Sequence, residues 1–190
     1  MDRLADKLTG YIISQNFISK DDYDIYKYGM QTSFEMILYM AICSVVAIYI
    51  KSFFEFLMVI SIFFSLRAFV GGIHLKHFIT CLTCSFLVIN SILILPKFYI
   101  PYKSGSLIFT WICLLSIFLL APGAIKNSMK DQKEWIYLEK QRKRILIGIA
   151  ILGLVFWTFN LSKLLSLIFY TTIAVFISMV LEIIKNVKNM

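Results

Sequence analysis

The chain has 190 residues, of which 59% are hydrophobic and 16% are charged, and its formal net charge is +8. A soluble domain is usually about 45–50% apolar and about a quarter charged, and a chain of this size cannot hide such an excess in a core. The composition therefore excludes an ordinary soluble enzyme and predicts a membrane protein. In that setting the positive charge indicates contact with lipid headgroups rather than with nucleic acid.

The N-terminal segment, residues 1–30, is predicted to hold a helix that lies on the cytoplasmic membrane surface. Leu4, Leu8 and Tyr11 recur at roughly helical spacing among charged residues, which is typical of an amphipathic interfacial helix. No small-residue cleavage site follows an apolar core here, so we expect no secretory signal. An acidic turn at residues 20–24 precedes the apolar part of the chain.

Residues 31–190 are predicted to form one transmembrane domain, an all-α polytopic bundle. About six apolar segments follow one another, at 32–50, 53–70, 78–96, 105–122, 145–161 and 164–183. A membrane-crossing helix needs about 20 residues, so most of these segments are long enough. We expect Pro96 and Pro101 to lie in a loop, and Pro122-Gly123 to end the fourth segment, because proline disrupts a helix interior.

The distribution of basic residues predicts the orientation of these segments. With a cytoplasmic N-terminus and six crossings, 15 of the 19 basic residues fall on the cytoplasmic side. The other side holds only Lys51, Lys97, Lys103 and Lys163. Such asymmetry predicts that both termini are cytoplasmic, together with the connection 67–81 and the basic loop 123–144. The basic loop is either a topology determinant or a docking surface for an acidic peptide.

The connection between the second and third segments carries the reactive residue types. Residues 67–84 hold the only two histidines, two of the four cysteines and the only Gly-Gly pair. Cys81 falls in the first turn of the third segment, where the helix dipole favours a thiolate. Cys84 lies one turn deeper, where desolvation opposes ionisation. Residue chemistry alone therefore makes Cys81 the better nucleophile, while Cys43 and Cys113 are expected to be inert packing residues.

Two histidines are available as the base for Cys81. His77 is four residues away and would be its neighbour on a continuous helix. His74 is seven residues away, roughly 10 Å along a helix, and reaches Cys81 only if the chain folds back at Gly71-Gly72. Spacing alone therefore favours His77. Both histidines also fit an ordinary role as hydrogen-bonded residues at the membrane boundary.

Two other classes of function remain open at this point. His74, His77, Cys81 and Cys84 are zinc-ligand types, so a metal or redox protein is one alternative, although one helix cannot wrap all four around an ion. A small transporter or exporter is the other, suggested by polar residues within apolar segments: Glu35, Glu55, Asn90 and Glu182.

The same connection resembles the signature of a known family. Arg67-x3-Gly71-Gly72-x-His74, followed after six residues by Cys81, is similar to the motif of the AgrB family. These are membrane cysteine endopeptidases that process the pro-peptide of a bacterial quorum-sensing signal. The chain length, the amphipathic N-terminus, the apolar segmentation and the break before a basic loop also fit that family.

The resemblance implies a specific site and a specific reaction. His74 and Cys81 would be the catalytic pair, without metal or cofactor, and His77 and Cys84 would be bystanders. Supporting positions would be Arg67, Gly71 and Gly72, and substrate contacts would include Lys126 and Lys130. Cys81 would cut off the C-terminal tail of the precursor, and the resulting thioester would allow closure of a thiolactone or lactone ring.

The resemblance also implies partners and a location. The partner would be an AgrD-like precursor peptide with an amphipathic leader and an acidic tail, lying on the inner leaflet. The enzyme would be a multi-pass homodimer in the bacterial cell membrane, with no role for nucleic acid.

Overall fold

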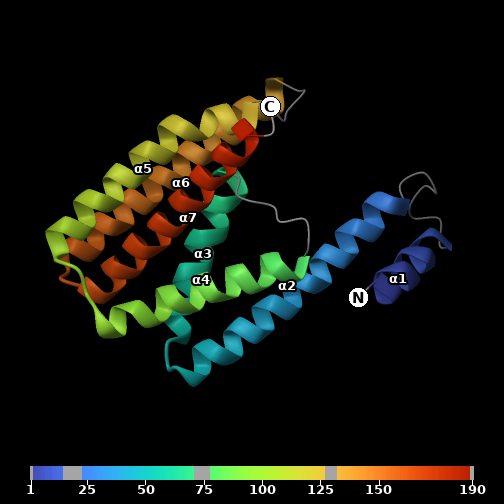
Figure 1. Ribbon diagram of the computed structural model, residues 1–190, viewed down its shortest axis with the longest axis horizontal. Coiled ribbons are helices and arrows are strands. Elements are labelled where there is room, and N and C mark those ends of the chain that lie inside the picture. The colour runs from blue at the N-terminus through green and yellow to red at the C-terminus, as the bar shows by residue number, and fades with distance from the viewer. Residues whose placement is uncertain (1, 15–22, 71–77, 127–131, 189–190) are drawn as a thin grey trace. The chain divides into compact units, whose positions relative to one another are not determined.

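The computed structural model describes residues 2–14, 23–70, 78–126 and 132–188, and these residues form seven α-helices (Figure 1). The helices are α1 (Asp2–Ser14), α2 (Tyr23–Tyr49), α3 (Phe53–Val70), α4 (Phe78–Phe98), α5 (Lys103–Lys126), α6 (Gln132–Thr158) and α7 (Ser162–Lys188). The predicted all-α fold is confirmed, with one short N-terminal helix followed by six longer ones.

The helices group into two compact units, Met1–Tyr49 and Ile50–Met190. The first unit contains α1 and α2, and the second contains α3 to α7. The division suggested by composition, between residues 30 and 31, lies inside α2, because that helix continues from the polar residues after Tyr23 into the apolar run without a break.

In the first unit, α1 packs against the beginning of α2. The Asp6 carboxylate accepts hydrogen bonds from the Lys27 ammonium at 2.8 Å and from the Tyr23 hydroxyl. These donors, Lys27 above all, hold the pKa of Asp6 below its ordinary value. Thr9 is fully buried on α1. Asp6, one of the charged residues of the predicted amphipathic helix, thus binds α1 to α2.

In the second unit, α5, α6 and α7 run side by side (Figure 1), and the most extensive contact joins α5 to α7. The helix α3 packs against α6 and α7, while α4 packs against α7 and α3. The core is aliphatic and aromatic, with fully buried side chains that include Phe56, Leu66, Ile117, Ile168 and Met179. Interdigitated apolar side chains therefore hold the five helices together.

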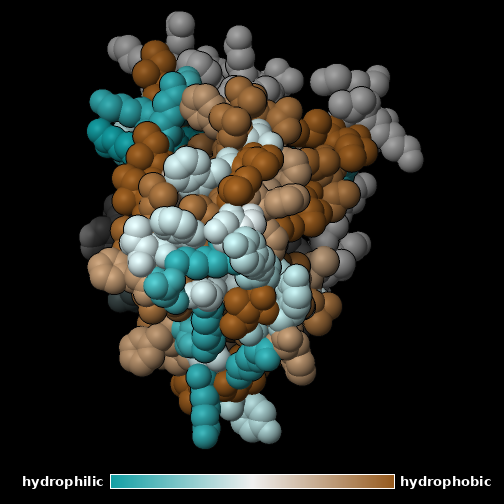
Figure 2. Space-filling model, turned by 90° about the vertical axis from the view of Figure 1, so that its left-hand side faces the viewer, coloured by the Kyte–Doolittle hydropathy of each residue, from teal (hydrophilic) through white to brown (hydrophobic). Residues whose placement is uncertain are grey.

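Three of the described helices are long and apolar enough to cross a membrane. They are Tyr23–Tyr49, Lys103–Leu120 and Ser162–Lys185, and the shorter apolar helix Thr83–Phe98 joins them. Many large apolar side chains are exposed, such as Phe54 at 84% and Phe98 at 85%. On the face drawn in Figure 2, hydrophobic side chains lie at the surface beside hydrophilic ones. Water does not favour such a surface, which suits contact with lipid.

Three helix boundaries differ from the sequence-based expectation. Pro96 lies inside α4 rather than in a loop. Because α4 ends at Phe98, the hydrogen bond that proline cannot donate is lost only near the end of the helix. The helix α5 continues to Lys126 and is not ended by Pro122-Gly123. The expected basic loop 123–144 is helical from Gln132 onward, because Lys, Arg, Gln and Glu are all good helix formers.

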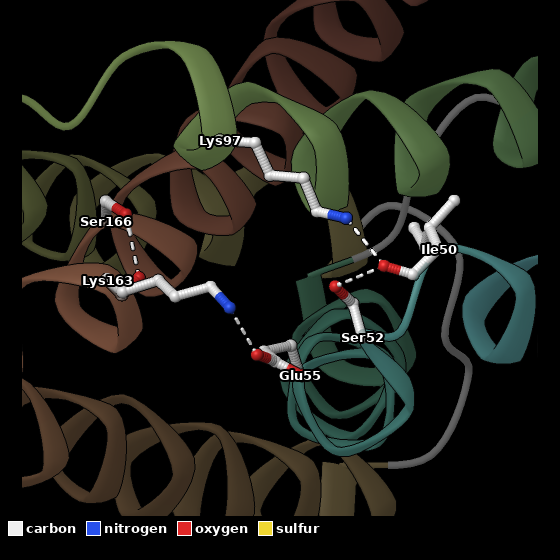
Figure 3. Close-up of polar contacts among 6 residues, drawn as sticks. All are labelled: Ile50, Ser52, Glu55, Lys97, Lys163 and Ser166. Atoms are coloured by element: carbon white, nitrogen blue, oxygen red, sulfur yellow. Dashed lines mark hydrogen bonds and ion pairs between the residues drawn. The ribbon is translucent and has the colours of Figure 1, made fainter.

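Polar contacts join three helices at one end of the second unit (Figure 3). Lys163, at the start of α7, forms an ion pair with Glu55 in the first turn of α3 at 2.5 Å. Lys97, near the end of α4, donates to the carbonyl oxygen of Ile50 at 2.6 Å. Ser52 precedes α3 and stands three residues before Glu55, which is the spacing of a capping box. The Ser52 hydroxyl itself donates to the carbonyl oxygen of Ile50 at 3.4 Å, the same oxygen that accepts from Lys97.

Candidate active site

Cys81 lies in the first turn of α4, because that helix begins at Phe78. This agrees with the helix start expected from the sequence. The free backbone N–H groups of a first turn and the positive end of the helix dipole both favour a thiolate over a thiol. The position of Cys81 therefore suits a nucleophile, whereas a cysteine in the middle of the same helix would lack this stabilisation.

Arg67 links the end of α3 to the beginning of α4. Its Nη1 atom donates a 3.4 Å hydrogen bond to the Ser85 hydroxyl, and its guanidinium lies 5.8 Å from the centre of the Phe63 ring. Ser85 is four residues after Cys81, which is one helical turn. Arg67 thus holds α4 one turn beyond the cysteine. The sequence named Arg67 as a supporting residue but gave no indication of Ser85 as its partner.

Several other residues named in the sequence analysis, some in the motif and some beside it, are not among the described residues. Gly71, Gly72, His74 and His77 lie outside the described residues, as does Lys130. Cys81 and Lys126 belong to helices α4 and α5, and only their backbone is described. The pairing of His74 with Cys81 therefore stays a prediction.

The other three cysteines occupy two kinds of environment. Cys43 and Cys113 are buried, with exposed fractions of 1% and 7%, as expected for packing residues. Cys84 is exposed and forms no disulfide. Among the described residues no three His, Cys, Asp or Glu side chains gather as metal ligands would. Cys84 is thus a useful chemical comparison for Cys81, because it is exposed on the same helix, three residues further on.

A cluster of charged side chains lies on α6, in the segment that was predicted to be the basic loop 123–144. Arg142 is only 3% exposed, and its guanidinium lies 6.0 Å from the centre of the Phe118 ring on α5. Lys143 forms an ion pair with Glu139 at 2.8 Å. Arg142 shares a helix face with the buried residues Leu146 and Ile149, and this i, i+4, i+7 spacing was the available signal that Arg142 is buried.

Comparison with known proteins assigns the chain to a family. The family model for Accessory gene regulator B, AgrB, matches residues 5–184, which is nearly the whole chain. No curated protein and no solved structure gives a significant match. The match covers helices α2 to α6 in full and most of α1 and α7, and it includes Arg67 and the first turn of α4. The chain therefore belongs to the AgrB family, whose members are known as peptidases that process the AgrD precursor.

Proposed function

We propose that this protein is a membrane cysteine endopeptidase that removes the C-terminal tail of an AgrD-like precursor and prepares it for ring closure. The observation that carries the proposal is the family match over residues 5–184, combined with a cysteine in the first turn of α4. Three candidate spans are consistent with action on a peptide held at the membrane.

The proposed reaction is acyl transfer through Cys81. The Cys81 thiolate attacks the carbonyl carbon of the peptide bond, with His74 taking the thiol proton. The bond to the tail breaks, His74 returns the proton to the leaving amine, and the signal segment stays on Cys81 as a thioester. A cysteine thiolate of the substrate, or a serine hydroxyl whose proton passes to His74, then attacks the same carbon. This step releases Cys81 and closes a thiolactone or lactone ring.

The membrane setting contributes to both halves of the reaction. A thioester is hydrolysed by water, and a site beside hydrocarbon keeps water away while the ring closes. The described residues of α6 carry four basic side chains between residues 140 and 144, which attract an acidic tail toward the enzyme. Lys126 and Lys130, from the same basic region, are proposed to contact the substrate, and the resemblance implies that the enzyme acts as a homodimer.

The test is co-expression with the cognate precursor, followed by mass spectrometry of the peptide products. Cys81→Ala should abolish cleavage, and His74→Ala should lower it by at least about a hundredfold, as expected for loss of a general base. Cys84→Ser is the matched control on the same helix and should retain most of the activity. Cleavage that survives Cys81→Ala but not Cys84→Ser would refute the assignment of the nucleophile.

An acyl-enzyme adduct distinguishes this mechanism from simple hydrolysis. A precursor whose internal nucleophile is replaced by alanine cannot close the ring. With that precursor, the protein should accumulate a mass adduct equal to the signal segment, and hydroxylamine should release it. Absence of the adduct in active wild-type enzyme would exclude the proposed thioester intermediate.

A further inference from the structure

The helices α5 and α6 form an apolar groove of about 830 Å³ on the second unit. Its apolar lining includes Ile108, Trp111, Ile112 and Phe118 of α5, and Ile147 and Ala150 of α6. Lys143 is the one charged residue among those that line it. The α5 wall lies in the candidate span Lys103–Leu120, so the groove faces hydrocarbon if that helix crosses the membrane.

One end of the groove is cationic. The ring of Phe118 has the Arg142 guanidinium at 6.0 Å and the Lys143 ammonium at 5.8 Å from its centre. Within the described part of the chain, the Nε and Nη2 atoms of Arg142 are buried without a hydrogen-bond partner. Lys143 uses Glu139 as its partner, but an ammonium has three donors. At this cationic end, Arg142 and Lys143, only Lys143 lines the groove and offers donors to an anion, while the buried Arg142 adds its positive charge.

An unpaired buried guanidinium is costly, because its lost hydration is not replaced. An anion bound by Lys143 would offset the positive charge of the guanidinium without contacting its buried nitrogen atoms. The surrounding charge favours an anion, since residues 139–144 contain four basic side chains and one carboxylate. The groove thus has a charged end that suits an anion and an apolar length that suits a hydrocarbon chain.

We propose that this groove binds an anionic glycerophospholipid, with one acyl chain along α5 and α6 and the phosphate at the cationic end. From Ile108 to Phe118 the groove extends for about 15 Å, which suits an extended acyl chain lying along the helices.

The test measures lipid retention by the full chain and does not depend on peptidase activity. The protein is reconstituted in nanodiscs of phosphatidylcholine with phosphatidylglycerol, released into mild detergent, and weighed by native mass spectrometry. The wild-type protein should retain phosphatidylglycerol in preference to phosphatidylcholine. Lys143→Gln should reduce that preference about five- to tenfold, the size expected for loss of one charge-assisted contact.

Two further variants separate the parts of the site. Lys140→Gln removes the same charge from an exposed residue that does not line the groove, and the lipid preference should not change. Ala150→Phe fills the groove and should lower retention of both lipids while the helical content stays constant. Soluble glycerol phosphate should not compete with the lipid, because it lacks the acyl chain.

Three outcomes would overturn the proposal. They are equal retention of the two lipids by the wild-type protein, equal effects of Lys143→Gln and Lys140→Gln, and competition by glycerol phosphate. A photo-crosslinking residue at Ile112 that captures precursor peptide instead of lipid would reassign the groove to the peptide. Loss of cleavage with intact lipid retention would affect only the proposed peptidase function, so the two proposals fail separately.

Discussion

At the scale of single residues, Arg67 combines a charge that is costly near hydrocarbon with a defined partner on another helix. Arg67 lies in the last turn of α3 and donates to Ser85 on α4, one turn after Cys81. A charged residue in an apolar helix usually marks function or a buried partner. Here the contact is with the helix that carries the proposed nucleophile, so we interpret Arg67 as a positioning residue.

Arg67→Ala should therefore lower kcat for precursor cleavage about tenfold or more, with a smaller change in KM, because the substrate still binds while Cys81 is misplaced. The rate of Cys81 alkylation, followed against pH in a protein that lacks the other three cysteines, should also fall. Ser85→Ala removes only the hydrogen bond and should have the weaker effect. Equal rates of alkylation in wild-type and Arg67→Ala protein would contradict a positioning role.

At the scale of helices, the contact between α1 and α2 rests on an exposed carboxylate with two donors. Asp6 accepts hydrogen bonds from Lys27 and Tyr23, and the pKa of Asp6 is lowered by them. A carboxylate whose pKa is lowered in the folded state stabilises that state above its unfolded pKa. The contribution is lost as the pH falls through the lowered value.

The α1–α2 contact should accordingly be intact at neutral pH and weaken below about pH 4. Spin labels at Gly10 and Asp24, which line the same small pocket, would report the separation of the two helices as reduced dipolar broadening. Asp6→Asn should show the loosened spectrum at every pH. A wild-type spectrum that is identical at pH 3 and pH 7 would rule out this dependence on Asp6.

At the scale of the whole molecule, the number of helices and the number of candidate spans differ. Six long helices follow α1, and three of them meet the length and hydropathy of a membrane span. The charge asymmetry predicts that Tyr102, which is 80% exposed, lies on the outer side of the membrane and that Lys140 lies on the cytoplasmic side. Both sites are accessible in the structure, so they can report the orientation.

In intact cells, a membrane-impermeant maleimide should label Tyr102→Cys and not Lys140→Cys, in a protein whose four native cysteines are replaced. Permeabilised cells should show labelling at both sites. The opposite pattern would reverse the predicted orientation, and labelling of both sites in intact cells would place them on the same side of the membrane.

The helices could be predicted because long apolar runs separated by polar breaks leave few alternatives. The helix ends were less predictable, since the residues around Gln132 are charged and yet are good helix formers. The contact between Arg67 and Ser85 was not visible, because hydropathy says which segments are apolar and not which polar atoms meet across helices. The burial of Arg142 did have a signal, in its helical spacing from Leu146 and Ile149. The proposed catalytic pair came from the motif, and it stays a prediction, since Cys81 is described only as a backbone position at the start of α4 and His74 lies outside the described residues.

The polar contacts at the end of the second unit hold three of the four lysines that the predicted orientation places outside the cell. Lys163 is paired with Glu55, Lys97 with the Ile50 carbonyl and Lys103 with the Asn160 side chain. A bacterial membrane potential, negative inside, pulls an outer cation inward with about 2.3 kcal/mol per charge for each 100 mV. A paired lysine presents no net charge to that field, and a lysine bound to a backbone carbonyl or an amide is anchored against it. These contacts would therefore keep the outer ends of α3, α4, α5 and α7 in place in an energised cell.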